Sequence, residues 1–211
     1  MDNRLIYNLE EGLRQPLPGR AAQYEMAHAV RQDTPPPPPN AREAGVLALL
    51  FPKDKDWHLT LILRQNNNPN DRHGGQVSFP GGKREVHDED LRATALREAE
   101  EEVGVDPSAV NLLGALSELY IPVSNFKVQP YVGFTEQTPQ FVPQPEEVQA
   151  VLEVPFRQFL SNNTRRKKDL HLYPQLILRD VPYFDVADQT VWGATAMMIS
   201  ELVAVLSNSD N

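Results

Sequence analysis

Five consecutive prolines, Pro35 to Pro39, interrupt the chain ahead of its longest patterned stretch. Such a run adopts a stiff polyproline II conformation and cannot continue a helix or a central strand. We expect it to act as a spacer rather than as a ligand for a proline-binding module. It predicts a boundary between an N-terminal appendage with its linker, 1–39, and a main domain, 40–211. Within the appendage, Ala21 to Val30 is predicted to form a short helix that packs back on that domain.

Beyond the prolines, predicted strands alternate with predicted helices. Ala44 to Phe51 is an almost continuous apolar run of strand length, and Trp57 to Arg64 follows it after a polar turn. The segment 66–75 is rich in turn-forming residues. Further strands are expected at Val77–Phe79, Val110–Leu119, Lys127–Thr135 and Glu147–Val154, a hairpin at Leu170–Leu178 with Tyr183–Val186, and helices at Asp90–Val103, Phe156–Leu160 and Thr190–Leu206. This mixture predicts an α/β sandwich.

Composition excludes several classes of function. A chain of 211 residues with 40% hydrophobic residues can bury a full core, and its net charge of -9 disfavours binding to nucleic acid or to an anionic membrane. The absence of cysteine excludes disulfides, zinc–thiolate sites and thiol nucleophiles. No apolar run has the length of a membrane span, and the first residues lack a signal-peptide pattern. The expected location is cytoplasmic.

The helix expected at Asp90–Val103 places carboxylates where an amphipathic helix should be apolar. On a helical wheel of about 100° per residue, Glu102 lies only about 20° from Leu91, inside the apolar arc. Glu98, Glu101 and Glu102 are spaced i, i+3, i+4, so their like charges converge on one patch of the helix. One interpretation is a solvated acidic face. The other is a divalent cation, and ligands that are all oxygen favour magnesium or manganese. The spacing alone leaves both open.

The same helix contains a longer pattern. Residues Leu96–Val105 read LREAEEEVGV and resemble the core of the Nudix box, R-E-U-x-E-E-x-G-U, in which U is apolar. Glu89 stands eight residues before Arg97, as in the box. The glycine expected six residues before Glu89 is replaced by Lys83, with Gly82 one place earlier, so the loop has one extra residue. The resemblance implies a Nudix-type α/β/α sandwich around a mixed β-sheet, and metal-assisted hydrolysis of a diphosphate linked to another group.

A second resemblance concerns the substrate. Residues Gly75–Gly82 read GQVSFPGG and look like the GxVxFPGG signature of coenzyme A pyrophosphatases, in which the longer loop is usual. Residues Val191–Ala196, VWGATA, resemble the closing WGxTA helix of that subfamily. The chain departs from the subfamily at two places: Ile62 replaces a threonine in the upstream LLTxR element, and Asp71 stands where an arginine is expected.

The resemblance also implies roles for individual residues. Magnesium or manganese (Mg2+ or Mn2+) would be held by Glu98, Glu101, Glu102 and the carbonyl of Gly82, and would acidify a bound water. Glu101 or the loop acid Glu147 would take the proton of that water. Arg97 would orient Glu98 or pair with Glu89, a supporting role. The expected substrate contacts are Arg64, Arg72, Phe79, Gly81 and Lys83.

The function implied is hydrolysis of coenzyme A, or a derivative of it, to 3′,5′-ADP and 4′-phosphopantetheine. The partner would then be a small nucleotide substrate, with no nucleic acid and no membrane, and a homodimer is left open. Three alternatives remain. One is a Nudix pyrophosphatase that acts on ADP-ribose or dinucleoside polyphosphates, and another is a Nudix module that binds without catalysis. The third is a structural protein with an acidic helix, which a metal titration would distinguish.

Overall fold

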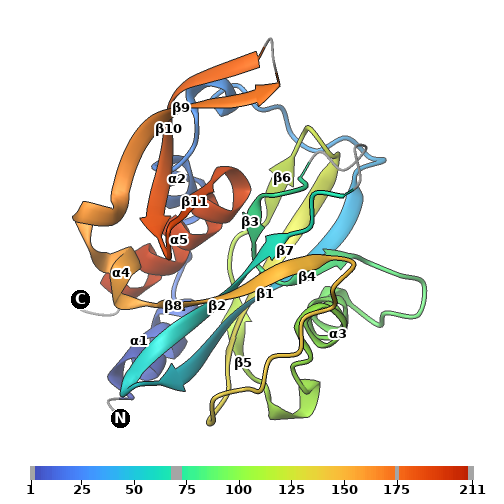
Figure 1. Ribbon diagram of the computed structural model, residues 1–211, viewed down its shortest axis with the longest axis vertical. Coiled ribbons are helices and arrows are strands. Elements are labelled where there is room, and N and C mark those ends of the chain that lie inside the picture. Colours follow the sequence, from blue (N-terminus) through green and yellow to red (C-terminus); the bar gives the residue numbers. More distant parts are fainter. Residues whose placement is uncertain (1–2, 68–72, 174–175, 209–211) are drawn as a thin grey trace.

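The computed structural model describes residues 3–67, 73–173 and 176–208 as a mixed β-sheet between two helical layers, with a second, smaller sheet beside it (Figure 1). The helix α3 covers one face of the mixed sheet, and α1, α2 and α5 cover the other (Figure 1). This is the Nudix-type α/β/α arrangement that the sequence predicts. The helices are α1 (Arg4–Leu13), α2 (Gly19–Tyr24), α3 (Leu91–Val103), α4 (Arg157–Leu160) and α5 (Gly193–Asn208), and short 3-10 turns occur at Ala29–Arg31, Pro107–Ala109 and Asn162–Thr164.

The mixed sheet is organised around β1, a long strand buried between its neighbours. It runs antiparallel to β2 and β4 and parallel to β7. The strand order is β3-β2-β1-β7-β5, while β8 pairs with β2 and β6 pairs with β7. The strands are β1 (Arg42–Lys53), β2 (Asp56–Arg64), β3 (Val77–Ser78), β4 (Gly81–Lys83), β5 (Asn111–Ala115), β6 (Leu119–Ile121), β7 (Phe126–Phe134) and β8 (Val148–Pro155).

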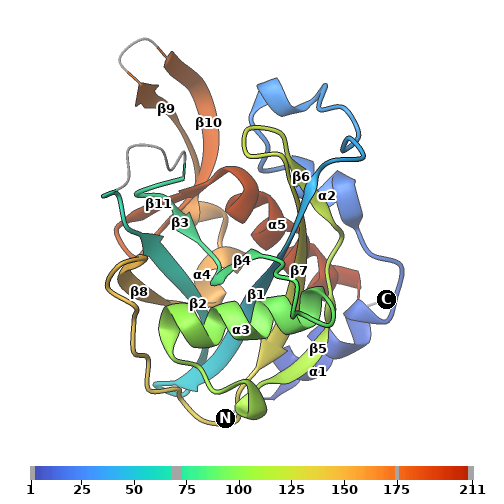
Figure 2. The same cartoon turned by 90° about the vertical axis from the view of Figure 1, so that its right-hand side faces the viewer.

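The second sheet contains three antiparallel strands in the order β11-β10-β9, namely β9 (Arg165–Tyr173), β10 (Leu176–Val186) and β11 (Gln189–Trp192). Strands β9 and β10 form an arm that projects from the body of the molecule (Figure 2). The hairpin expected between Leu170–Leu178 and Tyr183–Val186 is therefore wrong. Leu170–Leu178 is not one strand, because its first residues belong to β9 and its last residues belong to β10. The sequence did not indicate this, because β9 begins in the polar stretch RRKKD, where no alternation of apolar residues indicates a strand.

Two other boundaries differ from expectation. The single strand expected at Val110–Leu119 is two short strands, β5 and β6, which pair with different stretches of β7. The helix expected from Thr190 begins only at Gly193, because residues 189–192 pair with β10 as β11. In both cases, pairing with a distant strand decides the local structure, and periodicity along the chain cannot reveal it.

The N-terminal segment is more helical than its sequence predicts. Helix α1 is missing from the sequence prediction, and the helix expected at Ala21–Val30 is α2 followed by the turn at Ala29–Arg31. Both helices contact α5. Ile6, Leu9 and Met26 belong to the larger of two core clusters, which fills the space between the sheet and α5. The segment thus contributes to the core, and the boundary at 39/40 stays a prediction.

Candidate active site

Close packing between β1, β4 and α3 builds the base of the site. Gly45 on β1 leaves no room for a side chain, since a Cβ there would lie 2.3 Å from the carbonyl oxygen of Leu91 at the start of α3. Asp90 caps that helix by accepting a hydrogen bond from the Ala93 amide at 2.8 Å, and Gly104 ends it with a φ of 72°. The short strand β4 pairs with β1 at Gly82↔Gly45. Gly81 and Gly82, which with the preceding Phe79 and Pro80 are called the glycine loop below, are thereby held directly over the acidic part of α3.

Glu102 is the acid that the loop covers most completely. Its side chain is 2% exposed, and its Oε2 accepts a hydrogen bond of 2.8 Å from the backbone amide of Gly81. A cation, Arg64 on β2, also lies close, with its Nη1 3.7 Å from Oε1 of Glu102. Burial raises the pKa of Glu102 to about 8, although the Gly81 amide and Arg64 oppose the shift. The sequence prediction that this glutamate lies inside the apolar arc is confirmed.

Glu98 lies against the same loop. A Cβ on Gly82 would be 2.5 Å from the carboxylate oxygen Oε2 of Glu98, so glycine lets this carboxylate lie directly against the loop. At Gly81, where φ is 150°, a Cβ would lie 2.5 Å from the backbone carbonyl oxygen of Gly45, so the backbone itself requires glycine there. Burial raises the pKa of Glu98, and the neighbouring Arg97 opposes that shift. Glu101 and Glu147 also raise the pKa of Glu98 through their negative charges. Several carboxylates therefore repel one another beside a loop that excludes side chains.

Arg97 connects the acids of this region. Its guanidinium donates to Asp88 at 2.9 and 3.0 Å, to Glu98 at 2.9 Å and to Glu101 at 2.8 Å. It also donates to the carbonyl of Lys83 at 3.2 Å, which ties the helix to the loop. Arg97 therefore contacts Glu98, and its role in orienting that acid stays a prediction.

The expected pair with Glu89 is wrong, because the neighbouring residue Asp88 occupies that place. Asp88 is buried, accepts from the Glu85 amide and the Thr94 hydroxyl, and Arg97 holds the pKa of its carboxyl well below the usual range. Glu89 is exposed, and its carbonyl accepts a hydrogen bond from Arg84 at 3.0 Å. Sequence spacing missed Asp88, since only one of two adjacent acids in a loop can point inward and spacing does not say which.

Glu147 lies on the loop before β8 and influences the cluster through its charge. The Gln65 amide donates to its carbonyl at 2.8 Å, which attaches this loop to the end of β2. Its negative charge contributes to the raised pKa values of both Glu98 and Glu102. The side chain is exposed, and within the described ranges no hydrogen bond or ion pair holds its carboxylate.

The other predicted residues lie in different environments. Phe79 is 1% exposed and packs in the larger core cluster, so its side chain supports the loop and presents no surface to a ligand. Gly81 contributes its amide to Glu102, as described above. Lys83 is exposed directly after the glycine loop. Arg72 lies outside the described residues.

The donor chemistry fits a divalent cation that prefers oxygen ligands. Glu102 is buried and Glu98 is partly buried, both have raised pKa values, and a cation would relieve their mutual repulsion. In the described ranges, however, no three acidic or histidine side chains already surround a common point. The contacts explain this arrangement, because Arg97 holds Glu98 and Glu101 while the Gly81 amide holds Glu102.

The family model of the NUDIX domain matches residues 41–176, which include β1, the glycine loop, α3 and the Glu147 loop. This chain belongs to the Nudix family. Nudix hydrolases act on pyrophosphate bonds and generally use divalent metals such as Mg2+ or Mn2+.

Relatives agree with this assignment. The chain is 38% identical over 171 residues to Nudix hydrolase 22, chloroplastic, of Arabidopsis thaliana, with 78% of this chain and 55% of that protein covered. It is 36% identical to Nudix hydrolase 15, mitochondrial, of the same plant, with 78% and 58% covered. It is 37% identical over 148 residues to the Uncharacterized Nudix hydrolase NudL of Yersinia pestis, with 70% and 73% covered. The chain thus spans little more than half the length of the two plant relatives.

A solved structure shows the same fold at low identity. The Nudix hydrolase RenU of M. smegmatis superposes with a TM-score of 0.55 at 18% identity, over 79% of this chain and 86% of that one. None of the helices in the described ranges is long and apolar enough to cross a membrane. Because the relatives' names include a chloroplastic and a mitochondrial protein, the cytoplasmic location stays a prediction.

Proposed function

We propose that this Nudix hydrolase cleaves the diphosphate of coenzyme A or its derivatives and releases 3′,5′-ADP and 4′-phosphopantetheine. The observation that carries the hydrolase part is a buried acid, Glu102, beside a partly buried one, Glu98, both held under a loop that requires glycine at Gly81. Buried carboxylates with raised pKa values are costly to maintain, and such perturbed groups cluster at functional sites. A structural role does not explain two of them side by side.

The substrate part is supported by contact between the two motifs that resemble the coenzyme A subfamily. The hydroxyl of Thr195, in the WGATA segment, is buried and donates to the carbonyl of Val77, in the VSFPGG segment, at 2.9 Å. The strands β11 and β3 also contact each other. Segments more than a hundred residues apart in sequence therefore form one unit that supports the glycine loop.

In the proposed site, Glu98, Glu101, Glu102 and the carbonyl of Gly82 would hold Mg2+ or Mn2+. When bound, the metal neutralises diphosphate charge and acidifies a water. Arg97 is a positioning residue that keeps Glu98 and Glu101 in place through the contacts given above. Arg64 ends β2 and its guanidinium lies 3.7 Å from Glu102, which supports the proposal that it contacts the diphosphate.

The proton of the attacking water goes to Glu147 in this proposal. One oxygen of Glu101 is already occupied by Arg97 at 2.8 Å, whereas Glu147 is exposed and close enough to influence Glu98 and Glu102. The water oxygen bonds to one phosphorus as a bridging P–O bond breaks, which yields two phosphate monoesters. If the assignment is correct, Glu147→Gln lowers kcat by about 10²-fold or more, the usual contribution of a general base. Glu101→Gln would then affect metal dependence more than it affects the pH profile of kcat.

The deciding experiment is mass spectrometry of the products formed from coenzyme A with Mg2+ and with Mn2+, with excess EDTA as the control. Products of the stated masses support the proposal, and full turnover in EDTA would contradict the role of the metal. ADP-ribose and a dinucleoside tetraphosphate serve as competing substrates. Faster turnover of either one would keep the hydrolase and reject coenzyme A. Binding without turnover of any of the three would favour the non-catalytic module.

A further inference from the structure

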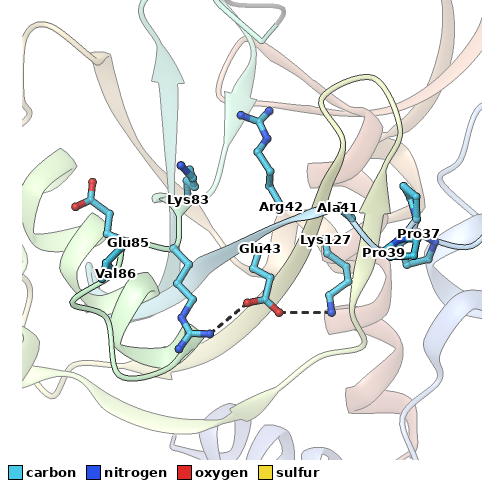
Figure 3. A pocket seen from close by; sticks show the side chains of 11 residues that line it. Pro37, Pro39, Ala41, Arg42, Glu43, Lys83, Glu85, Val86 and Lys127 are labelled. Carbon is cyan, nitrogen blue, oxygen red and sulfur yellow. Dashed lines mark hydrogen bonds and ion pairs between the residues drawn. The ribbon is translucent and has the colours of Figure 1, made fainter.

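A groove of about 780 Å³ lies beside the glycine loop, between the end of the proline run and the loop that leads to α3 (Figure 3). One wall is Pro37–Pro39, and Val86 and Lys83 lie on the other side. Its volume is in the range of sites for nucleotide-sized ligands. Pro35–Pro39 was expected to be only a spacer, yet three of its residues line a concave surface next to the proposed reaction site.

The groove is locally positive in a protein that is strongly negative overall. Four cationic and two acidic side chains line it, against a net charge of -9 for the chain. Glu43 is neutralised by Arg84 at 3.2 Å and by Lys127 at 3.6 Å, as the dashed lines in Figure 3 show. Glu85 is exposed and lies 3.6 Å from His87. The charge that remains available in the groove is therefore positive.

Arg42 and Lys83 supply that charge. They lie on the same face of the sheet, because Lys83 pairs with Ala44 and Arg42 is two residues before Ala44 on β1. In Figure 3 both side chains point away from the carboxylate of Glu43. Arg42 stacks on Phe126 at 4.0 Å and donates to the carbonyl of Ser124. Among the described residues, no carboxylate pairs with either of them.

We infer that this groove binds the nucleotide half of the substrate, with Lys83 and Arg42 contacting a phosphate monoester on the ribose and the prolines packing against the base. The inference rests on the proposed function, and it names the part of the substrate that this chain reads besides the diphosphate. A second cation is needed for the ribose phosphate, because the guanidinium of Arg64 lies 3.7 Å from Glu102 and is assigned to the diphosphate. The ligand class is an adenosine 3′,5′-bisphosphate, and Lys83 directly follows the loop that would hold the diphosphate.

The test measures binding of 3′,5′-ADP to the full chain by calorimetry, with 5′-AMP as the ligand that lacks the second phosphate. We expect 3′,5′-ADP to bind at least about 10-fold more tightly than 5′-AMP, as one lost charge-assisted contact implies. Lys83→Gln and Arg42→Gln should each remove most of that difference. Lys167→Gln is the matched control, since Lys167 is an exposed lysine on the distant arm formed by β9 and β10.

A second pair of variants covers the case in which Arg42→Gln loses stability with its Phe126 contact. Val86→Glu places a negative charge on a fully exposed residue of the groove and should weaken 3′,5′-ADP binding by about 10-fold or more, the loss of one charge-assisted contact. Val30→Glu is the matched control, because Val30 is an exposed valine outside the groove, and it should leave 3′,5′-ADP binding unchanged. Unchanged binding in the Lys83 and Val86 variants, or no measurable binding to the wild type, would overturn the inference.

The same experiment separates the groove from the proposed reaction. A wild type that binds 3′,5′-ADP through Lys83 and Arg42 but leaves coenzyme A intact keeps the groove and rejects the reaction. A wild type that hydrolyses coenzyme A equally well with every groove variant keeps the reaction and rejects the groove. In the expected outcome, Lys83→Gln raises the KM for coenzyme A by about 10-fold while kcat changes little.

Discussion

Glu102 and Glu201 are both buried glutamates, and they lie on helices that cover opposite faces of the same sheet. Glu201, on α5, is 0% exposed, and donors from three residues reach its carboxylate: the Gly19 amide at 3.0 Å, the Gln23 side chain at 2.8 Å and the Ser117 amide at 3.2 Å. Glu102, on α3, has one amide donor at 2.8 Å and a guanidinium 3.7 Å away.

The difference separates a structural carboxylate from a functional one. A buried charge is tolerated when hydrogen bonds satisfy it, and the donors to Glu201 join α5, the N-terminal segment and the residues after β5 into one unit. Among the described residues, fewer hydrogen-bond donors reach the carboxylate of Glu102, so burial raises its pKa to about 8. An incompletely satisfied acid beside further carboxylates indicates a site that a ligand completes. Glu201 thus stabilises the packing on one face of the sheet, whereas Glu102 on the other face belongs to the candidate active site.

The largest effect should come from deleting residues 1–34, which removes two of the three residues that donate to Glu201. Ile6, Leu9 and Met26 are also lost from the core, and each fully buried side chain of this size contributes about 1.5–3 kcal/mol. The sum approaches the total stability of a typical domain, about 5–15 kcal/mol. We expect the truncated chain to be insoluble or unfolded by circular dichroism. A soluble, cooperatively folding and active truncation would show that the boundary predicted from the prolines is a domain boundary.

The next largest effect should follow from Glu201→Ala. The substitution leaves the donors of Gly19, Gln23 and Ser117 without their acceptor, and each unsatisfied buried group costs about 1–3 kcal/mol. We expect the free energy of unfolding to fall by about 3 kcal/mol or more in denaturant titrations. Turnover per folded molecule should stay close to that of the wild type. Equal loss of turnover and stability would mean that α5 also shapes the active site.

Glu102→Gln should show the reverse pattern. It removes a proposed metal ligand, so turnover should fall by at least about 10²-fold, whereas the metal-free protein should be no less stable because the neutral amide never carries the cost of ionising a buried carboxyl group. Glu100→Gln is the matched control on the same helix, because Glu100 is exposed and outside the cluster. It should change stability by no more than about 0.5 kcal/mol. Near-normal turnover of Glu102→Gln would leave the family's fold here without the proposed metal site.

The smallest effect concerns the pH dependence of stability in the metal-free protein. The pKa of Glu102 is raised from 4.5 to about 8 in the folded state, so the folded protein binds this proton more tightly than the unfolded chain does. Stability should therefore decrease as the pH rises from about 4.5 to about 8, by at most about 1.4 kcal/mol per pH unit from this group. Glu98, whose pKa is also raised, acts in the same direction. Denaturant titrations in EDTA at pH 6 and pH 7 should show a steeper decline for the wild type than for Glu102→Gln.

Much of the active-site region could be predicted from the sequence because its determinants are local. The spacing of Glu98, Glu101 and Glu102 places them at neighbouring positions of one helix, and the adjacent glycines permit the close approach of the loop. The apolar strands that form β1 and β2 were likewise predicted, because strands buried on both faces are continuous hydrophobic runs. These features depend on residues within one element or one loop, where helix geometry and side-chain size are sufficient.

Only the tertiary structure decided the contacts between distant segments. It placed Asp88 rather than Glu89 on Arg97, divided Val110–Leu119 between two strands, and packed the N-terminal helices against Glu201. It also showed that Pro37–Pro39 line one wall of the positively charged groove. Each of these outcomes depends on which donor, strand or apolar surface a remote part of the chain brings into reach. Such pairings are selected by the burial and hydrogen bonding of the whole fold, so no single stretch of sequence contains them.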